Sequence, residues 1–188
     1  MLIKSIFVVF FAFLSGCNNG DDGGSSDPIR STTAALACPT SQKGIVGCWV
    51  TEKCNLVNGG DGKPSEYWGN TKVLFSQEGK IEFLGQQFVD SSCSGKPDTT
   101  TTSRDMVASY TEGQSTKDAS GVEASQIIVT LTFRDQEPFD ISTLYFISDN
   151  YRLCMSENFK ITHDSVVVSQ SASSAIDFNS CLIRAGET

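Results

Sequence analysis

Cysteine is the residue type with the most chemistry in this chain, because thiols form disulfides, bind metals and act as nucleophiles. The 188 residues include seven cysteines and a single histidine, His163. Zinc sites usually combine clustered cysteines and histidines, often with C-x-x-C spacing. The chain has no C-x-x-C pair. We therefore expect neither a metal nor a cofactor, and we expect the thiols to serve another purpose.

Candidates for catalysis are few. His163 precedes Asp164 in a polar stretch, KITHDSV, and no G-x-S-x-G nucleophile motif is present. Residues 58–66 (NGGDGKPSE) contain Asp61 but lack the ligand pattern of an EF-hand, so we interpret them as a turn. We interpret His163 as a solvated loop residue and do not expect an enzyme.

The amino-terminal residues predict export. Lys4 is the only charge in residues 1–16, and residues 6–14 (IFVVFFAFL) are uniformly apolar. A basic start followed by a short apolar run is typical of a signal peptide. The run is too short for a transmembrane helix, which needs about 20 residues.

The end of this apolar run gives Cys17 a specific role. Leu14-Ser15-Gly16-Cys17 resembles the lipobox of bacterial lipoproteins. The resemblance implies that residues 1–16 are removed and that Cys17 receives two acyl chains on its sulfur, as palmitate or a similar acid. Two chains anchor a protein stably to a membrane, whereas one does not. The alternative is an ordinary secretory signal, with Cys17 left to form a disulfide.

Residues 17–37 predict an acylated cysteine followed by a flexible tether. Residues 18–37 are rich in Gly, Ser, Asp and Asn, and such a coil spans roughly 25 Å. In one bacterial sorting rule, aspartate after the acylated cysteine retains a lipoprotein in the inner membrane. Asn18 stands there instead, which favours the outer membrane, on a face that the sequence does not specify.

The six cysteines that follow Cys17 predict disulfides, because an even number in an exported chain is typical of a disulfide framework. Fifteen pairings are possible. The set that we favour is Cys54–Cys93, Cys154–Cys181 and Cys38–Cys48.

Residues 38–188 predict one all-β domain. Residues 126–133 (QIIVTLTF) alternate apolar and polar side chains, and residues 71–76 and 80–88 read as a hairpin that turns near Gly79. Further strands are expected at residues 143–148, 151–156, 165–169 and 175–183, and polar loops at residues 94–104 and 112–125. We find no long amphipathic helix. These strands predict a single antiparallel up-and-down β-barrel of about eight strands.

Three short matches resemble lipocalins. Gly47-Cys48-Trp49 resembles the Gly-x-Trp that opens their first strand, and residues 148–151 (SDNY) resemble a diluted form of their Thr-Asp-Tyr turn. The resemblance implies a lipocalin-like barrel in which Arg184, on the last strand, stacks on Trp49 and closes one end. The chain departs from the family in the turn, which has Ser148 and an inserted Asn150, and in the long stretch 156–174 before the last strand.

A closer likeness is to small bacterial lipoproteins of lipocalin-like type. The shared features are the tether, Trp49, the nearby Cys54, a Phe-rich hairpin and residues 88–93 (FVDSSC). This likeness supports the Cys54–Cys93 pairing.

Five phenylalanines carry the functional hypotheses. They are Phe75, Phe83, Phe133, Phe146 and Phe178. If they line an apolar cavity, the protein binds a small hydrophobic or amphiphilic ligand such as a fatty acid. If they fill the barrel, the domain is an envelope interaction protein (an accessory, adhesion or inhibitor module) whose polar residues 94–125 meet a protein partner.

The net charge argues against one class of partner. The formal charge of −8 at pH 7 is unfavourable for contact with nucleic acid, so we expect none.

Overall fold

The computed structural model describes residues 6–10, 37–39, 42–58, 64–102, 106–148, 151–163, 165–169 and 175–186. Cys17, residues 18–36 of the predicted tether and most of the predicted signal peptide lie outside the described residues, as do Asp149 and Asn150 of the predicted turn. All of the regular secondary structure in the described residues is β-strand.

The strands cover most of the described chain. They are β1 (Ile6–Phe10), β2 (Gly47–Thr51), β3 (Asn55–Asn58), β4 (Pro64–Phe75), β5 (Lys80–Phe88), β6 (Thr99–Thr102), β7 (Met106–Lys117), β8 (Glu123–Phe133), β9 (Phe139–Ile147), β10 (Arg152–Ser156), β11 (Phe159–Ile161), β12 (Ser165–Ser169) and β13 (Ile176–Arg184).

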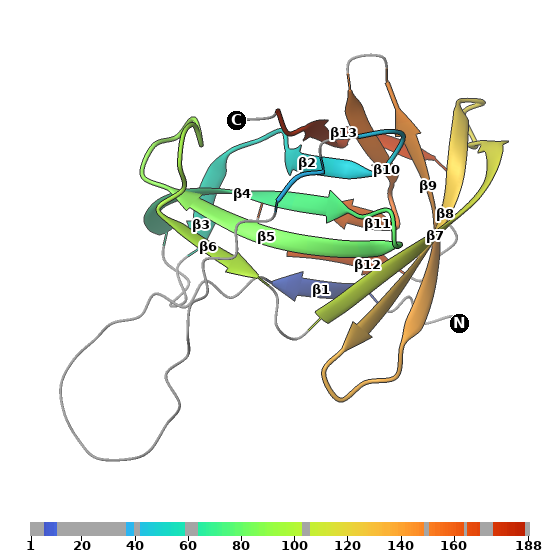
Figure 1. Cartoon of the computed structure of the whole chain (residues 1–188), viewed down its shortest axis with the longest axis horizontal. Coiled ribbons are helices and arrows are strands. Elements are labelled where there is room, and N and C mark those ends of the chain that lie inside the picture. Colours follow the sequence, from blue (N-terminus) through green and yellow to red (C-terminus); the bar gives the residue numbers. More distant parts are fainter. Residues whose placement is uncertain are drawn as a thin grey trace.

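Eight strands form a closed antiparallel barrel, which confirms the predicted fold class (Figure 1). The order around the barrel is β2, β4, β5, β7, β8, β9, β10 and β13, and β13 pairs with β2 to close it. Each strand therefore pairs with the next barrel strand along the chain, which is up-and-down topology. This arrangement is consistent with a lipocalin-like fold. The short strands β3 and β6 pair with β4 and β5 respectively.

Alternation along the strands sorts the side chains as the sequence predicts. In β8, Ile127, Val129 and Leu131 are buried in the core, whereas Ile128 points to solvent. In β5, Ile81 and Phe83 are buried and Glu82 is exposed. The period of two residues therefore decides which side chains enter the barrel.

An inserted hairpin supplies part of the core. Strands β11 and β12 lie between β10 and β13 in the chain and form a separate small sheet with β1. Their side chains Phe159, Ile161, Val166 and Val168 are almost fully buried and belong to the same hydrophobic cluster as Trp49, Phe75 and Leu131. The described residues of the stretch 156–174, which is long for a lipocalin, therefore help to fill the barrel.

Buried polar side chains fix the base of this hairpin. Asn158 donates its Nδ2 to the carbonyl of Ser142 at 2.9 Å, and its Oδ1 accepts from the Thr143 hydroxyl at 2.8 Å. The Ser156 hydroxyl lies 2.7 Å from that of Thr143 and accepts the backbone N–H of Leu144 at 2.9 Å. Because buried polar groups need partners, this network holds the β10–β11 turn against β9.

The predicted polar loops are wrong in part. Residues 112–117 and 123–125 belong to β7 and β8, which form one long hairpin, and residues 99–102 form β6. Strand β4 begins at Pro64 rather than at residue 71. The far part of the β7–β8 hairpin is mostly exposed, so its sequence lacks the apolar alternation that reveals a buried strand.

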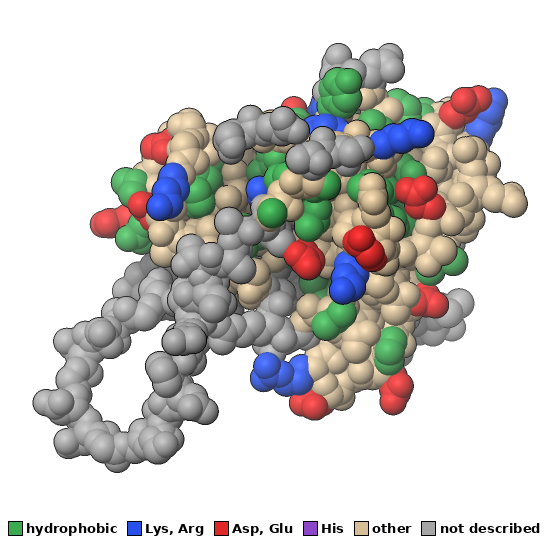
Figure 2. Space-filling view, viewed as in Figure 1, with side chains coloured by type: hydrophobic (Ala, Val, Ile, Leu, Met, Phe, Trp, Pro, Cys, Tyr) green, Lys and Arg blue, Asp and Glu red, His purple; other side chains and the backbone are tan. Residues whose placement is uncertain are grey.

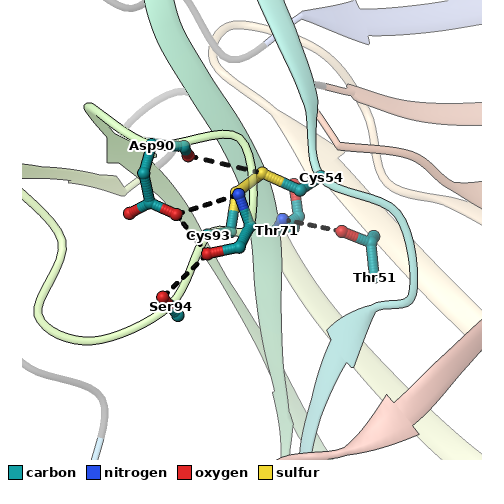
Figure 3. Close-up of a disulfide and its surroundings, with 7 residues drawn as sticks. Thr51, Cys54, Thr71, Asp90, Cys93 and Ser94 are labelled. Atoms are coloured by element: carbon teal, nitrogen blue, oxygen red, sulfur yellow. Dashed lines mark hydrogen bonds between the residues drawn. A yellow bond between two sulfur atoms is a disulfide. The ribbon is translucent and has the colours of Figure 1, made fainter.

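All three favoured disulfides are present. Cys154–Cys181 joins directly paired residues of β10 and β13, and Cys38–Cys48 ties the chain before the barrel to β2. Cys54–Cys93 joins the segment after β2 to the β5–β6 loop, beside the hydrogen bond from the Thr71 N–H to the Thr51 hydroxyl (Figure 3). Closing a loop of 39 residues is worth very roughly 3.5–4 kcal/mol in the chain-entropy model.

Candidate functional site

One end of the barrel is closed by Arg184. Its guanidinium lies 4.2 Å from the centroid of the Trp49 ring and 5.5 Å from that of Tyr151. It donates to the carbonyl of Gly44 at 2.9 Å and to Gln42 Oε1 at 3.2 Å. The contact between Arg184 and Trp49 that the lipocalin resemblance implies is therefore present. Burial lowers the pKa of this guanidinium, because a low-dielectric environment disfavours its charge.

Gly47 is required by this closure. Its φ is +142°, and a Cβ placed there would lie 2.9 Å from Arg184 Nη1 and 2.6 Å from Gln42 Oε1. Any side chain would therefore displace the guanidinium. The indole of Trp49 is held separately, because its Nε1 donates to the carbonyl of Ile45 at 2.8 Å. In the Gly-x-Trp motif, Gly47 therefore leaves space for the Arg184 guanidinium, and Trp49 provides the ring on which it stacks.

An open cavity of about 620 Å³ lies beside this end. Its lining residues come from the β7–β8 hairpin, from the end of β9 and from the turn before β2. They are Gly44, Ser115, Thr116, Lys117, Glu123, Ala124, Ser125, Tyr145, Phe146 and Ile147. Tyr145 to Ile147 provide an apolar wall, whereas Lys117 and Glu123 provide a charge of each sign. Such a lining suits an amphiphile better than a purely apolar molecule.

Two tyrosines near the cavity, Tyr145 and Tyr110, have raised pKa values. The Tyr145 hydroxyl lies 3.5 Å from Glu112 Oε1, and burial raises the pKa of Tyr145. Tyr110 donates to the carbonyl of Ser76 at 2.7 Å, and burial raises its pKa to about 12. Both phenols therefore stay neutral at physiological pH and act as hydrogen-bond donors rather than as bases.

The structure does not gather the five phenylalanines around one cavity. Phe75 and Phe83 lie in the barrel core, and Phe133 packs at its margin, with its ring stacked 5.8 Å from that of Phe139. Phe146 and Phe178 meet edge to face at 5.7 Å, and Phe146 packs on a second cluster that includes Cys154 and Cys181. Phe146 lines the open cavity, and the other four lie elsewhere.

His163 lies in a smaller cavity that the sequence did not predict. The cavity has a volume of about 200 Å³ and includes Glu52, Lys53, Thr162 and Asn179 among its lining residues. Its residues come from the end of β2, the β11–β12 turn and β13, which are far apart in the chain. No local sequence motif indicates that these residues line one cavity.

The part of the chain that the structure describes contains neither of two common kinds of site, a metal-binding cluster and a membrane-spanning helix. No three His, Cys, Asp or Glu side chains in those residues lie close enough to hold a metal ion. Nor do those residues contain a helix that is long and apolar enough to cross a membrane.

The described side chains scatter charge over the face drawn in Figure 2. Acidic and basic groups are interspersed there with apolar and neutral polar ones, and the described basic groups on that face form no continuous patch. This distribution does not favour a polyanionic partner on that face.

Comparison of the chain with protein-family models, with curated proteins and with solved structures finds no match. A function must therefore be argued from the residues and from the geometry above.

Proposed function

We propose that the processed protein is a lipid-anchored lipoprotein of the bacterial outer membrane whose barrel is an interaction module rather than a carrier of a small ligand. The lipobox residues 14–17 and the polar tether support the anchor. The proposal assigns no catalytic step to the domain.

The observation that carries the proposal is the packing of the barrel. A carrier needs an interior cavity, but Phe75 and Phe83 sit in a core cluster that also takes in Phe159, Ile161, Val166 and Val168 of the inserted hairpin. An eight-stranded barrel has room either to pack solid or to hold one small ligand. The space that a lipocalin-like carrier would give to its ligand is occupied here by the chain itself.

Two experiments test the proposal. Labelling of growing cells with radioactive palmitate should mark the protein and should fail for the Cys17→Ser variant; persistence of the label in that variant would refute the anchor. Native mass spectrometry of protein extracted from its own membrane should give the mass of the acylated chain from Cys17 onward. A further stoichiometric lipid would contradict the proposal that the domain carries no small ligand.

A second candidate function rests on the open cavity beside Tyr145. Its volume of about 620 Å³ is within the range of small-molecule sites, and it combines an apolar wall with Lys117 and Glu123. This candidate predicts saturable binding of a fluorescent fatty acid. Ser115→Phe would place a ring in the cavity and should weaken such binding, whereas Ser109→Phe, at an exposed position of the same strand outside the cavity, should not.

A further inference from the structure

Strand β12 lies between β1 and β11, and without β1 it would be an edge strand that lacks the usual protection. Its sequence is SVVVS, with three β-branched residues, no charge and no proline. The other short marginal strands, β3 (NLVN) and β6 (TTTT), are more polar. Edge strands that are apolar and uncharged pair readily with other strands, so proteins normally guard them. In the full chain this edge is covered by β1, which pairs with all of β12.

The hydrogen bonds of the hairpin show which backbone groups meet β1. Ser169 N–H donates to the carbonyl of Asn158 at 2.9 Å, and Thr162 N–H donates to the carbonyl of Ser165 at 2.8 Å. The direction of backbone groups alternates along a strand, so the N–H and C=O of Val166 and Val168 point to the opposite edge. There the register pairs Val166 with Val9 and Val168 with Phe7. Figure 1 shows β1 beside β12.

Processing before Cys17 would remove β1 and leave these backbone groups without their strand. We propose that the exposed edge of β12 in the processed lipoprotein binds an extended, uncharged apolar strand of a partner protein, antiparallel to β12 and in the place of β1. This inference rests on the proposed function, since it needs both the processing and the role as an interaction module.

The chemistry of the occupant follows from what the edge accepts. Strand β1 (IFVVF) consists only of β-branched and aromatic residues, and it shows that one extended strand of five residues fits. Lys160 of the hairpin is paired with Asp177 at 2.7 Å, so it offers no free charge to a partner. The side chains of Val166 and Val168 are buried in the core, which leaves the backbone and Val167 to make the contact. An uncharged apolar strand therefore suits the site better than a charged one.

The test uses the acylated, processed protein in phosphatidylcholine nanodiscs. The probe is a fluorescein-labelled peptide, KKSIFVVFKK, whose binding is followed by anisotropy with empty nanodiscs as the blank. An N-methyl group on the valine that corresponds to Val9 removes a bond to β12 and should weaken binding about tenfold. The same group on the valine that corresponds to Val8 points away from β12 and should change binding less than about threefold.

Two protein variants provide the matched comparison. Val167→Lys places a charge beside the added strand and should weaken binding about tenfold or more. Val107→Lys makes the same change at an exposed valine of β7 and should leave binding unchanged. Circular dichroism of both variants checks that the barrel is folded.

Each outcome bears on the proposal. Saturable binding with both expected contrasts supports the strand site, and absent binding or equal effects of the two N-methyl groups overturn it. A dimeric mass that Val167→Lys abolishes and the peptide cannot displace also overturns it, since SVVVS could pair with itself in a second copy. Protection of the Val166 and Val168 amides without peptide would mean that the tether already covers the edge, which overturns the partner-strand site. A purified chain that retains residues 1–16 overturns the proposed processing, whereas a processed chain that ignores the peptide overturns only the strand site.

Discussion

The two ends of the barrel are closed in different ways. At the end where β2 begins, one cation stacks on one indole, and the carbonyl of Gly44 and the side chain of Gln42 hold it in place. After Ser156, at the other end, the chain leaves the wall and sends an apolar hairpin into the core. The first closure depends on a few directional contacts, and the second on buried apolar area. This difference predicts that the hairpin contributes more to stability than the stack does.

The largest expected effect is at the hairpin. Phe159→Ala removes a fully buried ring, and large-to-small changes of this kind cost about 3–5 kcal/mol because a cavity is left behind. The free energy of unfolding in urea, with the disulfides intact, measures this loss. Phe178→Ala is the matched control: this ring is 45% exposed, so its loss should cost less than about 1.5 kcal/mol. Equal costs for the two variants would mean that the hairpin is not part of the core.

A smaller effect is expected at the other end. Arg184→Ala removes a cation–π contact of about 0.5–2 kcal/mol and the hydrogen bond to the exposed Gly44 carbonyl, worth about 0.5–1.5 kcal/mol, for a total of about 1–3 kcal/mol. Arg184→Lys keeps the charge but loses the planar fork, so it should fall between Arg184→Ala and the parent. Urea unfolding followed by tryptophan fluorescence measures both. A loss for Arg184→Ala that exceeds that of Phe159→Ala would reverse the comparison.

A change at the base of the hairpin should lower the stability of the hairpin more than that of the barrel wall. Asn158→Ala removes the Nδ2 donor to the Ser142 carbonyl and the Oδ1 acceptor of the Thr143 hydroxyl, which keeps only its contact with Ser156, and this should cost about 1–2 kcal/mol. Amide exchange of residues 159–169 should speed up more than that of β8. Uniform acceleration across the barrel would show that the network stabilises the whole fold rather than the hairpin.

The smallest expected effect on stability is at Asp118, which belongs neither to the Arg184 closure nor to the hairpin. It depends on pH and is lost in acid. Hydrogen bonds to Asp118 from the Ile176 N–H, from the Ser120 hydroxyl and from the Val122 N–H lower its pKa to about 2. A carboxyl with a depressed folded-state pKa stabilises above its unfolded value of about 3.9, and this contribution is lost as the pH falls through about 2.

The Asp118→Asn variant tests this dependence. Its urea midpoint should be lower than that of the parent at pH 6, and the difference should shrink between pH 4 and pH 2. Glu137→Gln, at an exposed position of the β8–β9 turn, should show no such convergence. A constant difference down to pH 2 would contradict the role of the Asp118 carboxylate.

The sequence predicted the features that depend on local patterns. Alternation in residues 126–133 identified a barrel strand, and Gly47, Trp49 and Arg184 identified the closure. The favoured disulfide pairs are also present, and the likeness to small bacterial lipoproteins supported the Cys54–Cys93 pair among them. In each case the signal is a residue type at a fixed spacing.

The hairpin and the cavity could not be predicted in this way. Phe159 and Ile161 lie in a short stretch that has no motif, and only the packed structure shows that they enter the core. Alternation says that a side chain faces inward but not what it meets, so Phe75 and Phe83 looked equally suited to a pocket. The outer part of the β7–β8 hairpin was missed because its exposed residues show no apolar period.

Residue-resolved amide exchange of the processed protein tests most directly whether the hairpin is part of the core. The account predicts that the amides of Thr162 and Ser169, which bond across the hairpin, exchange as slowly as those of Val129 in the barrel wall. Exchange of these two amides within seconds, with the barrel wall still protected, would contradict it.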